Sequence, residues 1–118
     1  MIRGEFINVL FVCSRNRWRS PTAETLFRSF PGIRARSCGT SKAARKQVQN
    51  ADIDWADLVI VMEDEHTSRL KARFRQSLNS EFIYVLDIPD EYQFMDPDLV
   101  DVLEQTVTPI LMAALKQD

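Results

Sequence analysis

Residues 8–21 read NVLFVCSRNRWRSP, an apolar run that leads into a short polar loop with three arginines and then to a proline. The run over residues 7–13 is apolar enough to be a strand buried on both faces, as in a parallel sheet. Residues 21–30 carry apolar side chains at helical spacing, with Ser20 as the expected N-cap and Pro21 in the first turn. A strand, a loop and a helix N-terminus in this order form an anion site, because the loop N–H groups and the helix dipole point at the anion.

The loop also carries side chains suited to chemistry at phosphorus. Cys13 ends the strand, where loop N–H groups and a helix N-terminus favour the thiolate, the nucleophilic form of cysteine. Arg19 follows six residues later, and its planar guanidinium can hold a phosphate through two parallel hydrogen bonds, which a lysine cannot do. We therefore interpret Cys13 as a nucleophile that attacks phosphorus and Arg19 as the ligand of the phosphoryl oxygens. The alternative is that Cys13 is only a buried thiol at the end of a strand. That interpretation does not explain why the loop carries three arginines.

The length and composition are those of a single globular domain over residues 1–118. The two cysteines lie far apart in the sequence and form no disulfide framework, which favours a reducing compartment. The first residues lack a signal-peptide pattern, and no apolar run approaches the ~20 residues of a membrane span. We expect a cytoplasmic protein that is a monomer or weak dimer and has no membrane partner.

Charge is distributed unevenly along the chain, although the net charge is only −2. Residues 1–48 contain ten Lys and Arg and two Asp and Glu, whereas residues 49–118 contain five and fifteen. If the loop lies in the basic half in space, anionic substrates are steered towards it. The basic stretch at residues 40–50 lacks interleaved aromatic residues, so a nucleic-acid partner is not expected.

Strand-like and helical segments alternate along the rest of the chain. Strands are expected at residues 33–38, 58–62 and 82–87, a helix at residues 64–75, and a loop or short helix at residues 40–50. The last helix is expected to begin after Asp96 as N-cap and to kink or restart at Pro109. The alternation indicates an α/β fold with a parallel sheet and right-handed crossovers. In such sheets ligands bind at the carboxyl ends of the strands, where Cys13 is expected.

At residues 13–21 the chain resembles the low-molecular-weight protein tyrosine phosphatases, which carry a Cys-x5-Arg-Ser-Pro signature after their first strand. Residues 35–40, 56–63 and 88–92 also match the family, in the same order. The resemblance implies a flavodoxin-like, three-layer fold whose four-stranded parallel sheet has the order 2-1-3-4 and helices on both faces. It also implies a protein tyrosine phosphatase that acts on phosphorylated proteins or small phosphomonoesters. Such an enzyme works through a cysteinyl-phosphate intermediate and uses no metal or other cofactor.

The resemblance assigns roles within the loop. Cys13 is the nucleophile, and Arg19 holds the equatorial oxygens. Ser20 donates a hydrogen bond to the Cys13 thiolate, a role that can coexist with capping the helix, and Asn16 braces the loop. The backbone N–H groups of residues 14–19 complete the cradle. The expected substrate-binding residues of the loop are Ser14, Arg15, Asn16, Arg17, Trp18 and Ser20.

Three features depart from the family's usual pattern. Arg15 stands where the family usually has glycine, whose backbone freedom such a loop uses. Trp18 replaces a second loop cysteine found in many members, so a disulfide between Cys13 and position 18 is impossible. The stretch at residues 40–50 is much shorter than in the family, where it holds part of the substrate wall.

The leaving oxygen of a phosphomonoester needs a proton donor. The family uses an aspartate on the loop after the fourth strand, and Asp90 matches this position, with Glu91 in place of the usual proline. Asp96 is the second candidate, although it better fits a helix cap, and Asp87 is the third. Tyr92 is expected either to stack on an aromatic leaving group or to pack on the surface.

Two other functions remain open. An arsenate reductase-like enzyme uses the same anion loop with a thiol relay, for which Cys38 is the only other thiol, although burial is its expected state. The other is a non-catalytic phosphate-binding or interaction module, in which Arg15 and the shortened substrate wall have abolished turnover.

His66 is the single histidine of the chain. It has no second ligand candidate four residues further on, so it is expected at the surface and not as a metal ligand.

Overall fold

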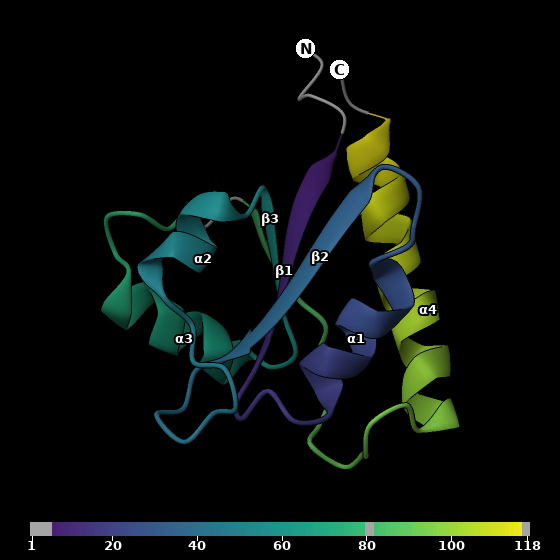
Figure 1. Ribbon diagram of the computed structural model, residues 1–118, viewed down its shortest axis with the longest axis horizontal. Coiled ribbons are helices and arrows are strands. Elements are labelled where there is room, and N and C mark those ends of the chain that lie inside the picture. Colours follow the sequence, from purple (N-terminus) through teal and green to yellow (C-terminus); the bar gives the residue numbers. More distant parts are fainter. Residues whose placement is uncertain (1–5, 80–81, 117–118) are drawn as a thin grey trace.

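The computed structural model describes residues 6–79 and 82–116 (Figure 1). Strands and helices alternate in the order β1 (Ile7–Cys13), α1 (Arg19–Phe27), β2 (Ile33–Gly39), α2 (Asn50–Trp55), β3 (Leu58–Val61), α3 (Asp64–Arg73), β4 (Ile83–Val85) and α4 (Pro97–Leu115). This confirms the α/β class and the positions of most of the expected elements. None of the helices in the described ranges has the length and apolar character needed to cross a membrane.

The strands form a parallel sheet in the order β2-β1-β3-β4, which confirms the expected topology. Cys13 pairs with Gly39 across the sheet, and Val12 pairs with Val61. The carboxyl ends of β1, β2 and β3 therefore meet at one edge, and the loops that follow these strands converge there.

Side chains of β1 alternate between two cores on opposite faces of the sheet. Val9, Phe11 and Cys13 face the core under α1 and α4, whereas Leu10 and Val12 face the core under α2 and α3. Figure 1 shows these two pairs of helices on opposite sides of the strands. The five side chains are buried, as expected for a central parallel strand that is covered on both faces.

The last helix, α4, begins as the sequence predicts. The Asp96 side chain accepts a hydrogen bond from the Asp98 N–H at 2.9 Å, and Pro97 occupies the first turn. The helix does not restart at Pro109 but runs through it. Val107 and Leu111 on either side of the proline are buried in the core, so packing outweighs the one backbone hydrogen bond that the proline removes.

The structure corrects two local predictions, the cap of α1 and the length of the last strand, and it decides between the two alternatives for residues 40–50. Ser20 does not cap α1, because this helix already begins at Arg19 and the Ser20 hydroxyl is used within the loop. Residues 40–49 form a loop, and the short helix α2 begins after it, where the Gln49 N–H donates to Asp52 in a capping box. The edge strand β4 covers only part of the expected range 82–87, since it pairs with β3 alone and two of its three side chains are exposed.

Candidate active site

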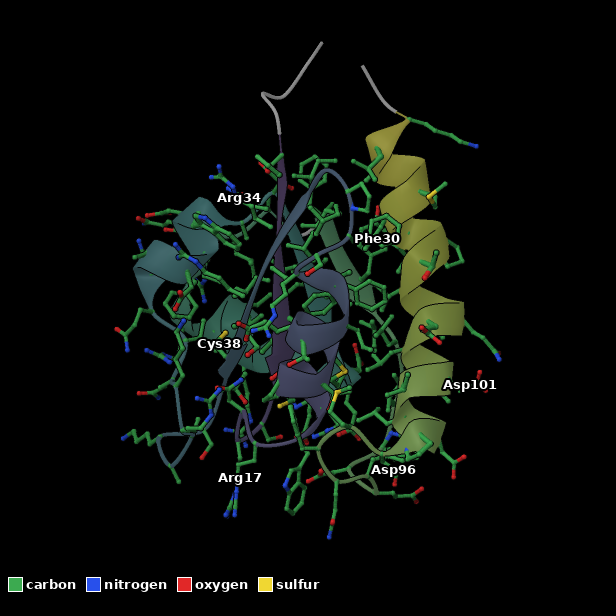
Figure 2. The ribbon with its side chains drawn as sticks, turned by 45° about the vertical axis from the view of Figure 1, so that its right-hand side comes forward. Arg17, Phe30, Arg34, Cys38, Asp96 and Asp101 are labelled. Atoms are coloured by element: carbon green, nitrogen blue, oxygen red, sulfur yellow. The ribbon has the colours of Figure 1, made fainter. Side chains whose placement is uncertain are left out.

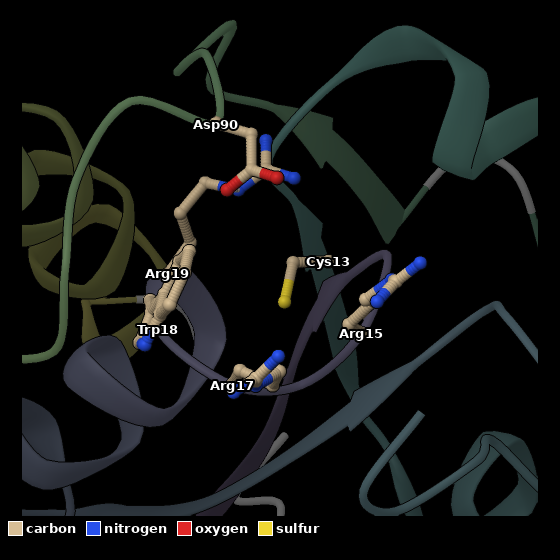
Figure 3. Close-up of a pocket in the computed structure, with 6 residues that line it drawn as sticks. All are labelled: Cys13, Arg15, Arg17, Trp18, Arg19 and Asp90. Atoms are coloured by element: carbon tan, nitrogen blue, oxygen red, sulfur yellow. Dashed lines mark ion pairs between the residues drawn. The ribbon is translucent and has the colours of Figure 1, made fainter. Parts of the chain in front are cut away.

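A pocket of about 300 Å³ opens at the carboxyl end of β1 and is lined by Cys13, Arg15, Arg17, Trp18, Arg19 and Asp90. In Figure 3 the Cys13 sulfur lies in the middle, with Arg19 and Asp90 on one side and Arg15 and Arg17 on the other. Asp90 reaches the pocket from the loop after β4, and the other five residues belong to the strand end, the loop and the start of α1. A thiol ringed by three guanidinium groups is suited to bind and attack an anion.

The Cys13 sulfur contacts Ser20, the side chain that the family resemblance implies as its partner. Ser20 Oγ lies 3.0 Å from Cys13 Sγ, and it accepts a hydrogen bond from Asn16 Nδ2 at 3.0 Å. The Ser20 hydroxyl proton is then shared between the sulfur and the carbonyl oxygen of Cys38 at 3.3 Å. A thiolate is the stronger acceptor of the two, so formation of the anion draws this hydrogen bond to sulfur.

Asn16 holds the loop in shape from inside. Its backbone has φ of 55°, its side chain is buried, and its Nδ2 also donates to Ser37 Oγ at 2.9 Å. Ser37 in turn donates to Glu24 of α1. The left-handed position of the loop is therefore Asn16 and not Arg15, and asparagine tolerates that conformation better than most residues. Position 15 therefore does not need the backbone freedom of glycine, which explains how Arg15 fits where the resembled family usually has glycine.

Arg19 is buried, with 2% of its surface exposed. Its Nη1 donates to Glu63 Oε1 and to the carbonyl oxygen of Ile88 at 2.8 Å. Its Nε lies 3.6 Å from Asp90 Oδ1, which is an ion pair too long for a hydrogen bond. The contacts within the described residues thus leave Nε and Nη2 as the donor pair that a phosphate can use.

His66 is buried and not at the surface, so the expectation for this residue is wrong. Its Nδ1 accepts the Glu63 N–H at 3.0 Å, and its Nε2 lies 2.9 Å from Ser14 Oγ. Burial, followed by the nearby Arg19 charge, lowers the pKa of His66 to about 4. The imidazole is therefore neutral at pH 7 and serves to hold the loop. The only sequence signal for this role was the position of the histidine in the first turn of a helix that follows a buried strand. Its burial could not be predicted, because it depends on the packing of α3 against the loop.

The aspartates that compete for the role of proton donor lie in different places. Asp90 lines the pocket and pairs with Arg19, whereas Asp96 caps α4. Asp87 has φ of 62° and is absent from the pocket lining. Tyr92 is half-buried and packs against the core under α1 and α4, so its stacking on a leaving group stays a prediction.

Three side chains near the site carry groups that can bind a metal ion. Glu63, Glu65 and His66 place one ligand atom each within 4.8 Å of one another. Both ring nitrogens of His66 already take part in hydrogen bonds, and Glu63 is paired with Arg19. A cation would have to displace these contacts beside a buried guanidinium, so the group fits a metal ion poorly.

Comparison with protein-family models and with curated protein sequences gives no match. Solved structures do match. The YwlE arginine phosphatase from Geobacillus stearothermophilus is 20% identical, with a TM-score of 0.69 over 95% of this chain and 97% of that one. SP-PTP, a low molecular weight protein tyrosine phosphatase from Streptococcus pyogenes, is 21% identical, with a TM-score of 0.75 over 92% and 93%. The tyrosine phosphatase Wzb from Escherichia coli K30, in complex with phosphate, is 21% identical, with a TM-score of 0.70 over 88% and 95%. These similarities confirm the expected fold.

Proposed function

We propose that the chain is a cysteine-dependent phosphomonoester hydrolase of the protein tyrosine phosphatase type. The observation that supports this best is the Cys13 sulfur in a pocket with three arginines and Asp90. In such a pocket the thiolate is aimed at a phosphoryl group whose negative charge the guanidinium groups neutralise. The fold shared with solved phosphatases adds support by analogy.

The proposed reaction has two steps. In the first, the Cys13 thiolate attacks phosphorus, the bond from phosphorus to the leaving oxygen breaks, and Asp90 gives that oxygen a proton. Arg19 and the loop N–H groups hold the equatorial oxygens meanwhile. In the second step Asp90 takes a proton from a water molecule, whose oxygen attacks the phosphorus of the cysteinyl phosphate. Inorganic phosphate leaves, and the Ser20 hydroxyl stabilises the returning thiolate.

Phosphotyrosine in a protein is the substrate that we propose. Trp18 lines the pocket with 36% of its surface exposed, so its indole can stack on a phenyl ring. The YwlE structures suggest phosphoarginine as the rival substrate. Phosphoarginine, however, brings a guanidino group close to Arg15 and Arg17, and like charges disfavour that arrangement. We place the reaction in the cytoplasm, where both cysteines stay reduced.

The arsenate reductase alternative depends on Cys38. This residue is fully buried in the core under α2 and α3. Burial, with Asp52 as a further cause, raises the pKa of the Cys38 thiol well above its usual range. A neutral, inaccessible thiol is a poor relay to Cys13, so we rank this function below the phosphatase.

Hydrolysis of an aryl phosphate by the wild-type chain and by Cys13→Ser tests the proposal. The wild type should turn over, and the variant should not, although it should still bind phosphate or vanadate. Anion binding by the inactive variant shows that the pocket is intact. Hydrolysis that persists in Cys13→Ser would refute the mechanism, and a wild-type chain that binds phosphate without turnover would favour the non-catalytic module.

A further inference from the structure

Five exposed basic side chains lie on two loops that are hydrogen-bonded to each other where β1 and β2 end. Arg15 and Arg17 line the pocket itself, and Lys42, Arg45 and Lys46 lie on the loop after β2. All five are exposed. We call these five residues the basic rim. The sequence concentrates its positive charge in the first 48 residues, and the structure brings part of that charge to the site.

Backbone hydrogen bonds fix the segment that carries Lys42, Arg45 and Lys46 to the loop that follows Cys13. The Ser41 N–H donates to the Ser14 carbonyl at 2.9 Å, and the Arg45 N–H donates to the Arg15 carbonyl at 3.0 Å. Gly39 makes this approach possible, because a Cβ there would lie 2.5 Å from the Ser14 carbonyl oxygen. The Lys42, Arg45 and Lys46 side chains therefore project from a segment held directly against the site.

The basic rim carries charge that the protein itself does not neutralise. Within residues 6–79 and 82–116, no carboxylate forms an ion pair with any of the five side chains. Arg17 stacks on the Trp18 ring, with 5.2 Å between its guanidinium carbon and the ring centroid, which keeps its N–H groups available. Asp90 lies across the pocket from Arg15 and Arg17, and Glu91, the next residue in the chain, is also exposed.

We propose that this site selects phosphotyrosine segments that carry acidic residues on one side of the phosphotyrosine. The phosphate occupies the pocket, and carboxylates of the same peptide pair with the basic rim. The carboxylates of Asp90 and of the adjacent Glu91 disfavour further carboxylates on the other side of the phosphotyrosine. A peptide is favoured over a compact second phosphate, because Lys42 and Lys46 continue the surface beyond the pocket. The proposal rests on the proposed phosphatase function for the identity of the central group.

Binding to the Cys13→Ser chain tests the proposal without any need for turnover. Three phosphotyrosine peptides are compared by calorimetry, one with neutral flanks, one with three acidic residues before the phosphotyrosine and one with three after it. One of the two acidic peptides should bind about tenfold more tightly than the neutral one at low ionic strength, since each exposed ion pair contributes a small factor. The preference should shrink as salt is added.

Two double variants locate the effect on the surface. Lys42→Ala with Lys46→Ala, in the Cys13→Ser chain, should remove most of the preference for the acidic peptide. Arg28→Ala with Arg34→Ala deletes the same charge elsewhere in the basic half and should retain the preference. Figure 2 shows Arg34 and Arg17 towards opposite ends of the molecule. Loss of the preference in both double variants would mean that the overall positive charge of the basic half, and not the basic rim, causes the preference.

Three results would overturn the proposal. These are equal affinity for the three peptides, a gain from acidic flanks on both sides, and a small aryl bisphosphate that binds as tightly as the acidic peptide. The last result would assign the basic rim to a compact second anion. Failure of the proposed function has a different signature, because it appears as absence of aryl phosphate hydrolysis by the wild-type chain, whatever the order of peptide affinities.

Discussion

The Nε2 atom of His66 lies 2.9 Å from the hydroxyl oxygen of Ser14, the residue that follows Cys13. Because Nδ1 accepts the Glu63 N–H, the ring proton resides on Nε2, which donates to Ser14. Glu63, three residues before His66, holds Arg19 at the other end of the loop. The turn that opens α3 thus contacts both ends of the loop between Cys13 and Arg19, and it holds in place residues to which the proposed mechanism assigns the chemistry.

The free energy of unfolding should fall on acidification between about pH 6.5 and pH 4. The pKa of His66 is lowered from 6.5 to about 4 by burial and by Arg19. In this range the unfolded chain binds a proton that the folded chain excludes. The contribution of His66 is therefore intact above pH 6.5 and is lost as the pH falls, by on the order of 3 kcal/mol in all. Urea titrations at several pH values measure it.

His66→Gln is the control for that profile. Glutamine at this position can still accept the Glu63 N–H, as in a capping box, but it does not titrate. The variant should be less stable than the wild type at pH 7 and should show a flatter profile between pH 6.5 and pH 4. A profile as steep as that of the wild type would assign the acid sensitivity to other groups.

Arg19→Lys should lower kcat/KM for an aryl phosphate by roughly 10²-fold or more, because the charge remains while the two parallel hydrogen bonds are lost. Glu63→Gln should have a smaller effect of the same kind, since it keeps a hydrogen-bond acceptor for Arg19 but removes the ion pair that orients it. Steady-state kinetics on the purified variants measure both. An Arg19→Lys enzyme close to wild type would remove Arg19 from the phosphate site.

Asp90→Asn should slow substrates with poor leaving groups far more than those with good ones, because a stable leaving anion needs little protonation. Asp96→Asn should leave stability and turnover nearly intact, because asparagine caps a helix about as well as aspartate. Both variants are assayed on two aryl phosphates that differ in leaving-group basicity. A leaving-group-dependent loss in Asp96→Asn alone would mean that the wrong aspartate was chosen.

Asn16→Ala should destabilise the fold by about 2–3 kcal/mol, because it removes the hydrogen bonds to two buried hydroxyl groups and puts alanine, which tolerates a positive φ less well than asparagine, at this position. Asn16→Gly removes the same hydrogen bonds but accepts the positive φ. It should therefore cost less in unfolding free energy than Asn16→Ala. Thermal and urea unfolding compare the two, and equal losses would show that backbone strain contributes nothing at this position.

Chelators should leave phosphatase activity unchanged. The cysteine mechanism uses arginine and backbone N–H groups where other phosphatases use cations, and Glu63 and His66 are occupied by other contacts. Activity is measured before and after dialysis against EDTA and after addition of divalent ions. A strict requirement for a divalent ion would contradict the mechanism.

The strand-loop-helix unit around Cys13 could be predicted from the amino-acid sequence alone. A run of apolar residues specifies a strand covered on both faces, and the short spacing from Cys13 to Arg19 places these two residues at the two ends of one loop. These properties are local, because they depend on residues close together in the chain. The alternation of strands and helices also sufficed for a parallel sheet, while the order 2-1-3-4 came from the resemblance to a family.

The distant side chains that reach that loop could not be predicted from periodicity and spacing, because their positions depend on the tertiary structure. It buried His66 against Ser14, paired Glu63 with Arg19, and placed Asp90, rather than Asp96, at the pocket. It also moved the start of α1 to Arg19, which freed the Ser20 hydroxyl for Cys13 and Asn16. Such contacts depend on how the helices between the strands pack against the sheet. The pattern of apolar residues within one segment does not show which side chains from other segments will lie next to it.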